Sequence, residues 1–168
     1  MIFNQKQWFS NHIMDLSNGM YRVSYSILKN EMDAEDAVQE TIYKAYKSLD
    51  TLENKSKFKS WIYKILTNTS LEILKNKENY LDIDKEEIMI KKDDIDTNLT
   101  LWEAVQKLSQ PYRTTITLFY YEDMSIKEIS KITNTKEDAI KKQLSRGREK
   151  IKEVIKLWIF FKTERLKK

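Results

Sequence analysis

The chain of 168 residues has no cysteine, only one proline and only two glycines. Without cysteine it can form no disulfide, no Cys-ligated zinc site and no thiol nucleophile. The isolated glycines, Gly19 and Gly147, exclude a P-loop or a glycine-rich dinucleotide cradle. Because turn-rich β architectures need many more glycines and prolines, the composition favours an all-helical fold.

Histidine and long apolar runs are also scarce. A single histidine, His12, cannot build a multi-histidine metal site, and we expect an ordinary surface or partly buried side chain. The first residues lack a secretory apolar region, and the apolar block 158–161 is too short to span a bilayer. We therefore expect a cytoplasmic protein without membrane insertion, metal, cofactor or catalytic residues, and so not an enzyme.

Charge is unevenly distributed along the chain. Residues 1–78 hold 11 basic and 10 acidic side chains, residues 79–106 hold 3 and 8, and residues 107–168 hold 16 and 8. The net charges are thus +1, −5 and +8. A neutral front part, an acidic middle and a basic rear part indicate that different parts of the chain bind different partners. The positive charge of the rear part favours binding to the phosphate backbone of nucleic acid.

Apolar spacing predicts three helices in the front part. The first covers residues 5–30, and Gly19 leaves open a break near residues 17–19. The second begins with Asp33 as its N-cap, and the third covers about residues 57–76. Residues 79–97 lose this periodicity and gain charge, which indicates an interdomain linker.

The helical pattern returns at residue 98, and Pro111 lies where the first turn of a helix tolerates proline. Ser125 and Glu128 form a capping box, and Thr135 with Asp138 predicts a second one. Asn134, between them, suits a left-handed turn position. Two helix starts ten residues apart predict a helix-turn-helix. Its expected buried faces are Ile126, Ile129 and Ile132 on the first helix and Ile140 and Leu144 on the second.

The opposite face of the second helix is cationic, which is typical of a recognition helix that enters the major groove. Its basic residues are Lys136, Lys141, Lys142, Arg146 and Arg148. The alternative is a plain helical hairpin with solvated lysines. The two predicted caps, the Asn turn and the one-sided charge together favour the helix-turn-helix.

Both halves resemble bacterial sigma factors of the sigma-70 family, in the extracytoplasmic-function (ECF) group. In the front half the resemblance lies in residues 33–41, of sequence DAEDAVQET, and in Phe58, Trp61, Ile62, Ile65, Asn68, Glu72 and Lys75. In the rear half it lies in Leu108, Arg113, Leu118, Ser125, Glu128, Ile129, Ile140, Lys141, Arg146, Gly147 and Arg148. Ser130, Asn134 and Gly147 depart from the usual alanine, glycine and alanine.

The resemblance implies an all-α protein of two small helical domains. Residues 1–78 would be a domain 2-like helical bundle and residues 98–160 a domain 4-like helix-turn-helix. The linker 79–97 would join them, and residues 161–168 would form a basic tail. The implied function is to bind core RNA polymerase and direct promoter-specific transcription initiation in response to stress, under control of an anti-sigma factor.

The resemblance assigns the acidic helix start to polymerase docking, where carboxylates and an amide meet a basic partner surface. The residues expected there are Asp33, Glu35, Asp36, Gln39 and Glu40. The alternative is a helix whose acidic first turn only caps itself.

Opening of the promoter −10 element requires exposed bases to be captured by stacking and by polar groups. The candidates are Asn54, Lys55, Ser56, Lys57, Lys59, Trp61, Lys64, Asn68 and Lys75. Trp61 also fits the apolar stripe of its helix, so simple core packing remains the alternative for that residue.

Contact with the −35 element is expected from the rear half. Lys141, Lys142, Ser145 and Arg146 are the predicted groove-facing set, and the predicted phosphate contacts are Arg113, Thr135, Lys136 and Arg148.

Two rival functions remain open. A dimeric helix-turn-helix regulator binding an operator would need a dimerisation or ligand domain, and the front half lacks an obvious pocket motif. A helical adaptor without DNA recognition would leave the basic rear unexplained. The apolar stripe of residues 151–161 is expected to pack on its own domain, and contact with an inhibitory partner is the alternative.

Overall fold

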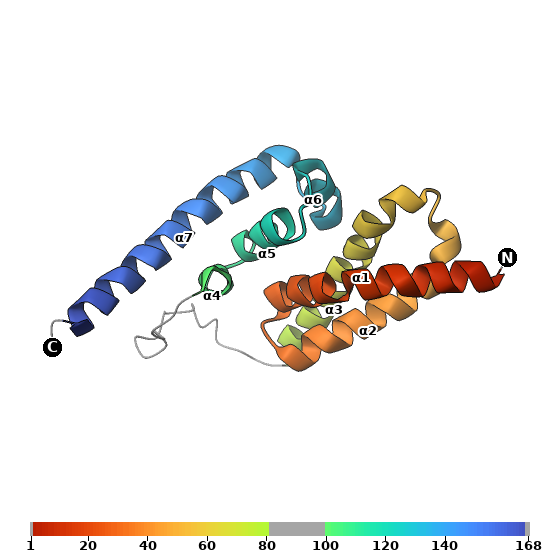
Figure 1. Ribbon diagram of the computed structural model, residues 1–168, viewed down its shortest axis with the longest axis horizontal. Coiled ribbons are helices and arrows are strands. Elements are labelled where there is room, and N and C mark those ends of the chain that lie inside the picture. Colours follow the sequence, from red (N-terminus) through yellow and green to blue (C-terminus); the bar gives the residue numbers. More distant parts are fainter. Residues whose placement is uncertain (1, 81–99, 167–168) are drawn as a thin grey trace.

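The computed structural model describes residues 2–80 and 100–166, and all regular structure within them is helical (Figure 1). The predicted all-α fold is therefore confirmed for these residues. The front helices are α1 (Ile2–Leu28), α2 (Glu31–Lys47) and α3 (Phe58–Tyr80), with short 3₁₀ turns η1 (Leu49–Thr51) and η2 (Lys55–Lys57) between α2 and α3. The rear elements are α4 (Leu101–Gln106), α5 (Tyr112–Ile116), the π-helical turn η3 (Thr117–Tyr121), α6 (Ile126–Thr133) and α7 (Glu137–Leu166).

The front domain is a bundle of α1, α2 and α3 around one apolar core. Its largest fully buried side chains are Met20, Val23, Ile62, Tyr63 and Leu66. The buried face of α2 carries only small residues, Ala34, Ala37, Thr41 and Ala45, at helical spacing. Small side chains let the α2 backbone approach α1 and α3 closely, so the acidic face of α2 is held on a rigid support.

Helix α1 runs through Gly19 without a break, so the continuous helix holds and the alternative of a break is wrong. A Cβ atom at residue 19 would overlap the Tyr63 hydroxyl and the Glu122 carboxylate. Glycine is therefore needed for close packing and not for a turn. A sequence pattern cannot distinguish these two uses of glycine.

The predicted N-cap of the second helix was wrong by one turn. Asn30, in extended conformation, accepts a hydrogen bond from the Asp33 backbone N–H, and the helix begins at Glu31. Asp33 is the third helical residue, where a carboxylate still meets the positive helix terminus.

The rear domain contains the predicted helix-turn-helix as α6 and α7. The Ser125–Glu128 capping box is present in both directions. Asn134 ends α6 in the left-handed region at φ 51° and ψ 43°. Ile129, Ile132, Ile140 and Leu144 are buried and Ile126 is partly buried, as predicted.

The second capping box differs from the prediction. The Thr135 hydroxyl donates to the Thr133 carbonyl, and α7 begins at Glu137, so Thr135 lies outside the cap position. Helix α7 continues to Leu166, past residue 160 and into the segment predicted as a basic tail.

Gly147 lies in the interior of α7, where α5 crosses it. A Cβ there would lie 2.9 Å from Ile116 Cγ1. The absent side chain lets the two helices approach, which offsets the low helix propensity of glycine. Residues 81–99, which hold almost all of the predicted linker, lie outside the described residues, and the exact domain boundaries stay predictions.

In the described ranges no helix is both long enough and apolar enough to cross a membrane.

The left-handed turn at Asn134 gives a direct test of the fold. We expect Asn134→Ala to lower the free energy of unfolding by about 1 kcal/mol, because a Cβ without a local polar partner is strained there. Asn134→Gly, which relieves that strain, should stay closer to the parental stability. Urea unfolding followed by circular dichroism measures both, and equal losses for the two variants would contradict the strained turn.

Candidate nucleic-acid and partner interfaces

The predicted docking residues come together on one face of α2. Asp33, Asp36, Gln39 and Glu40 line a groove of about 670 Å³ with Ile73 and Lys77 of α3. Glu35 is exposed on the same helix. Asp33 is less available than predicted, because its carboxylate forms an ion pair with Lys77 and its side chain is 14% exposed.

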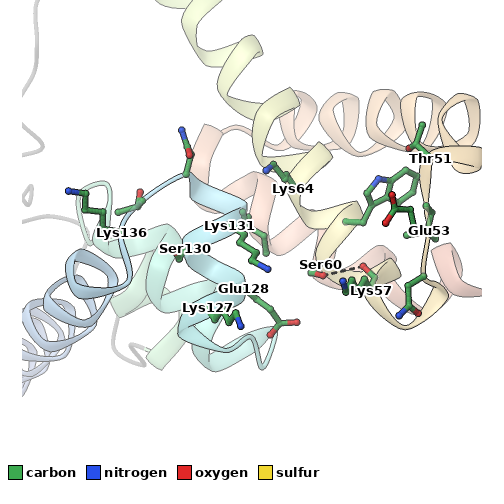
Figure 2. Close-up of a pocket in the computed structure, with 16 residues that line it drawn as sticks. Thr51, Glu53, Lys57, Ser60, Lys64, Lys127, Glu128, Ser130, Lys131 and Lys136 are labelled. Atoms are coloured by element: carbon green, nitrogen blue, oxygen red, sulfur yellow. Dashed lines mark hydrogen bonds between the residues drawn. The ribbon is translucent and has the colours of Figure 1, made fainter.

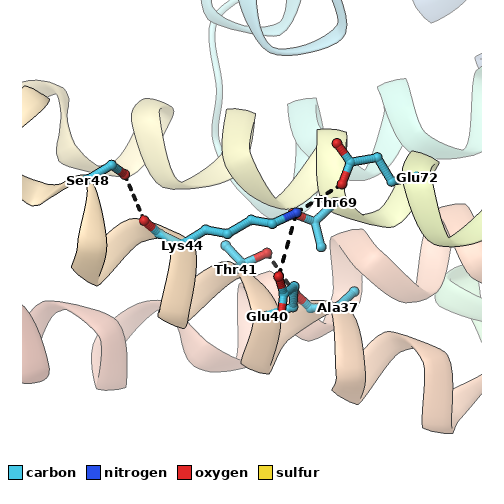
Figure 3. A network of polar contacts seen from close by, with 7 residues as sticks. All are labelled: Ala37, Glu40, Thr41, Lys44, Ser48, Thr69 and Glu72. Carbon is cyan, nitrogen blue, oxygen red and sulfur yellow. Dashed lines mark hydrogen bonds and ion pairs between the residues drawn. The ribbon is translucent and has the colours of Figure 1, made fainter.

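A polar network fixes this face of α2 against α3 (Figure 3). Lys44 Nζ lies 2.9 Å from Glu72 of α3, 3.8 Å from Glu40 and 3.4 Å from the Thr69 hydroxyl. These side chains are largely exposed, so the ion pairs add little stability. Their effect is to set the position of Glu40 relative to α3.

The predicted −10 loop is ordered by its own first residue. Asn54 Oδ1 accepts hydrogen bonds from the Ser56 backbone N–H and from the Ser56 hydroxyl. Lys55 lies over the Trp8 ring at 4.9 Å, and Lys57 is exposed. The loop therefore presents cationic side chains from a fixed backbone.

The candidate residues of α3 differ in their accessibility. Lys64, Asn68 and Lys75 are exposed. Trp61 is partly buried and packs on the core beside Phe58, at a ring-centroid distance of 6.0 Å. Lys59 Nζ donates to the Glu122 backbone carbonyl of the rear domain.

The rear basic face is largely as the spacing predicts. The exposed side chains are Lys136, Lys141, Lys142, Ser145, Arg146 and Arg148, and Thr135 is partly buried. Lys141 makes a weak contact with Asp138 at 3.4 Å, and Arg148 donates to the Tyr120 hydroxyl at 3.3 Å. The face opposite Ile140 and Leu144 is thus cationic and open to solvent.

Arg113 does not join this basic face. It is 4% exposed, and its guanidinium donates to the backbone carbonyls of Ser26 and Leu108. Burial lowers the pKa of Arg113 from its usual value. In this arrangement Arg113 binds the front domain, so a contact between Arg113 and DNA requires the domains to separate.

A cleft of about 1040 Å³ lies between the predicted −10 surface and the α6 side of the helix-turn-helix (Figure 2). On the front side it is lined by candidates including Asn54, Lys57, Trp61 and Lys64, and on the rear side by Thr135 and Lys136. Figure 2 shows two further lysines of α6, Lys127 and Lys131, on the rear wall. Sequence spacing did not single out these two residues, because they lie on the short helix that precedes the recognition helix.

A charged contact between the domains was not predicted from the sequence. Glu122 is 5% exposed, and its carboxylate accepts hydrogen bonds from Arg22 at 2.9 Å and from Tyr63 at 2.5 Å. Burial, and then the hydrogen bond to Glu122, raises the pKa of Tyr63, so its hydroxyl keeps the proton that it donates. Residues about 60 to 100 positions apart give no signal in local spacing.

Comparison with family models identifies a known domain in each half of the chain. Residues 13–79 match sigma-70 region 2, and residues 98–151 match sigma-70 region 4.

Two relatives from Bacillus subtilis (strain 168) match both halves. RNA polymerase sigma factor SigV is 37% identical over 138 residues, covering 80% of this chain and 83% of that protein. ECF RNA polymerase sigma factor SigW is 28% identical over 158 residues, covering 82% of this chain and 83% of that protein.

Two solved structures share the fold. The sigma factor RpoE of Bartonella quintana, crystallised with the anti-sigma factor NepR, matches with a TM-score of 0.71 and 23% identity, covering 88% of this chain and 96% of that one. CnrH, in complex with the cytosolic domain of CnrY, matches with a TM-score of 0.65 and 17% identity, covering 90% of each chain.

Proposed function

Because the chain belongs to the ECF group of sigma-70-family RNA polymerase sigma factors, we propose that three separate surfaces carry out the steps of transcription initiation. The acidic face of α2 docks on core RNA polymerase. The η2 loop with α3 captures the −10 element, and the basic face of α7 contacts the −35 element. The observation that supports this division most strongly is that the α2 face is acidic, whereas the η2 loop and the exposed face of α7 are cationic.

The function of the whole chain follows from its membership of the sigma-70 family. The chain binds core RNA polymerase and directs it to promoter DNA, and sigma factors are initiation factors and not enzymes. Since its partners are the polymerase and the chromosome, we place its action in the cytoplasm.

Docking follows from the charge and rigidity of α2. Glu35 and Asp36 are exposed, and the small buried residues behind them fix the helix on the bundle. Carboxylates held in fixed positions steer association with a basic surface and determine its orientation.

Capture of the −10 element follows from the ordered η2 loop. Single-stranded nucleic acid is held by a positively charged groove together with aromatic faces and polar groups. Lys57 and Lys64 supply charge beside a loop whose backbone Asn54 fixes. Trp61, packed on the core, supplies one edge of this surface and not a free stacking ring.

We further propose that a separate anti-sigma protein controls this chain. The support is the shared fold with RpoE of Bartonella quintana, which was crystallised with an anti-sigma factor. Affinity purification from the native host should recover a second small protein besides polymerase, and recovery of polymerase alone would count against this control.

Run-off transcription tests the function as a whole. Core RNA polymerase with this protein should give discrete transcripts from a subset of a promoter pool, and core polymerase alone should not. The same transcript pattern with and without the protein would overturn the assignment. A dimeric operator-binding regulator would instead bind its DNA site without polymerase and leave core polymerase inactive.

The docking surface predicts a loss of polymerase affinity on charge reversal. We expect Glu35→Lys combined with Asp36→Lys to weaken core binding about tenfold, which corresponds to ~1.4 kcal/mol. Asp33 is left unchanged, because loss of its ion pair with Lys77 would change the stability of the fold as well as the affinity for polymerase. The control is Asp15→Lys with Glu53→Lys, which makes the same change in charge at exposed positions of the front domain. Affinity for core polymerase is measured by fluorescence titration. Equal affinities of the two double variants would show that Glu35 and Asp36 stabilise only their own helix.

Substitutions in the recognition helix should have two different effects. Loss of a base contact should change the preferred DNA sequence, and loss of a phosphate contact should lower the affinity for all sequences. A side chain that contacts a guanine edge contributes roughly 1–3 kcal/mol of discrimination, whereas a phosphate contact weakens binding to all sequences alike. We expect at least one of Lys142→Ala and Arg146→Ala to change the −35 preference, and Arg148→Ala to weaken binding evenly. Binding-site selection at matched salt measures this. If Lys142→Ala and Arg146→Ala both keep the parental −35 sequence preference, the residues that recognise bases lie elsewhere in the rear domain.

A further inference from the structure

The η2 loop, the proposed site of −10 capture, is shaped by hydrogen bonds between near neighbours. Asn54 accepts hydrogen bonds from Ser56, and the Lys57 backbone N–H donates to the Asn54 carbonyl at 3.0 Å. The Ser60 hydroxyl donates to the Lys57 carbonyl at 3.1 Å. These contacts define the shape of the loop, and a contact from elsewhere in the fold is needed to define its position.

Trp8 of α1 supplies a contact of this kind. The Lys55 ammonium lies over the Trp8 ring, 4.9 Å from its centroid. Phe58, where the loop passes into α3, lies edge-on to the same ring at a centroid distance of 4.9 Å and an angle of 67°. Trp8 is partly buried and Lys55 is exposed. One ring from a distant part of the chain therefore contacts the loop at its start and at its end.

The Trp8 ring is itself held in place by the front-domain core. His12, one turn further along α1, donates from Nδ1 to the Trp8 carbonyl at 2.8 Å, and the two ring centroids lie 4.3 Å apart. Both rings meet Phe58, which is 3% exposed, and Phe58 in turn contacts the buried Phe9 at a centroid distance of 5.9 Å. Aromatic pairs at such distances favour defined relative orientations. The indole is therefore a fixed platform for the Lys55 side chain.

A fixed platform matters for a lysine because its side chain is long and has many rotamers. Indole attracts an ammonium group more strongly than the other aromatic side chains do, through the negative face of its ring. Held in this way, Lys55 keeps the first residue of η2 in one position before DNA arrives. A loop that is ordered in advance binds more tightly, because less conformational entropy is lost on binding.

We propose that Trp8 is a positioning residue for −10 capture, which acts by holding Lys55, and with it the η2 loop, in the geometry that receives an unstacked base. The proposal rests on the proposed function of this loop and adds a residue to it. The match to sigma-70 region 2 begins at residue 13, so Trp8 lies outside the matched segment. The alternative is an indole that only fills space beside Phe58.

Binding of single-stranded DNA by the complex with core polymerase tests this role. The probe is a fluorescent oligonucleotide that carries the −10 element of a promoter found by run-off transcription, with core polymerase present in excess. We expect Trp8→Leu, which keeps an apolar side chain and removes the aromatic face, to weaken binding about fivefold through loss of the cation–π contact. Trp8→Phe restores an aromatic face and should stay within about twofold of the parental affinity.

A scrambled oligonucleotide of the same composition separates positioning from general attraction, because the charge of Lys55 is unchanged in both Trp8 variants. Trp8→Leu should bind the scrambled strand as the parental protein does. The matched control is Tyr112→Leu, which removes a similar contact with Lys150, 5.5 Å from the ring centroid, in the rear domain. This control should leave binding of the −10 strand unchanged. Parental affinity of Trp8→Leu for the −10 strand, or an equal loss on the scrambled strand, would overturn the positioning role.

A double-variant cycle shows whether Trp8 acts through Lys55. Lys55→Met removes the ammonium group and keeps a long, flexible side chain. If the indole acts through this lysine, Trp8→Leu should weaken −10 binding no further in the Lys55→Met background. Equal losses from Trp8→Leu in both backgrounds would contradict a route through Lys55. If circular dichroism shows that Trp8→Leu does not fold, Trp8→Met takes its place in every arm, because methionine fills irregular gaps in a core.

The parental protein reports separately on the function on which this proposal rests. If its complex with core polymerase binds the −10 and scrambled strands equally, the η2 loop does not capture the −10 element, and the proposed function of the loop fails together with the role of Trp8. If the parental complex prefers the −10 strand and Trp8→Leu keeps the same preference and affinity, only the role of Trp8 fails.

Discussion

The burial of one carboxylate, that of Glu122, constrains much of the arrangement seen here. A carboxylate that leaves water must find donors, because an unpaired buried charge is strongly destabilising. Arg22 and Tyr63 supply these donors from different helices of the front domain. Gly19 must lack a side chain for the same reason. The close approach of η3 to α1 goes with the same contact.

The interface between the domains combines apolar packing with directional polar contacts. Each core is formed by apolar side chains whose burial is strongly favourable, such as Ile62 and Leu66 in front and Ile129 and Ile140 behind. Between the domains, ion pairs and hydrogen bonds lie beside apolar side chains, and the buried apolar residues of both domains form one continuous cluster. The apolar packing supplies the favourable burial, and the polar contacts fix the orientation of one domain on the other.

The sequence predicted those features that depend on neighbours in the chain. The Ser125 capping box, the turn at Asn134 and the one-sided basic face of α7 each lie within a few residues of their partners. The errors have the same local origin. Asn30, three residues before Asp33, takes the cap that Asp33 was expected to form. The hydrogen bond from Arg113 to the Ser26 carbonyl, 87 positions away, is a contact that no periodicity could indicate, and DNA contact by Arg113 stays a prediction. Roles that depend on a bound partner, such as base recognition by Arg146, stay predictions.

The two glycines, whose scarcity first indicated a helical protein, both lie inside helices. Glycine in a helix interior costs about 1 kcal/mol relative to alanine, so each position requires a compensating contact. For Gly147 that contact lies within the rear domain, against Ile116. For Gly19 it includes Glu122 of the other domain. The space at residue 19 is occupied by two side-chain ends, the Tyr63 hydroxyl of the same domain and the Glu122 carboxylate of the other. Glycine there therefore serves the packing of the front domain and the contact between the domains together.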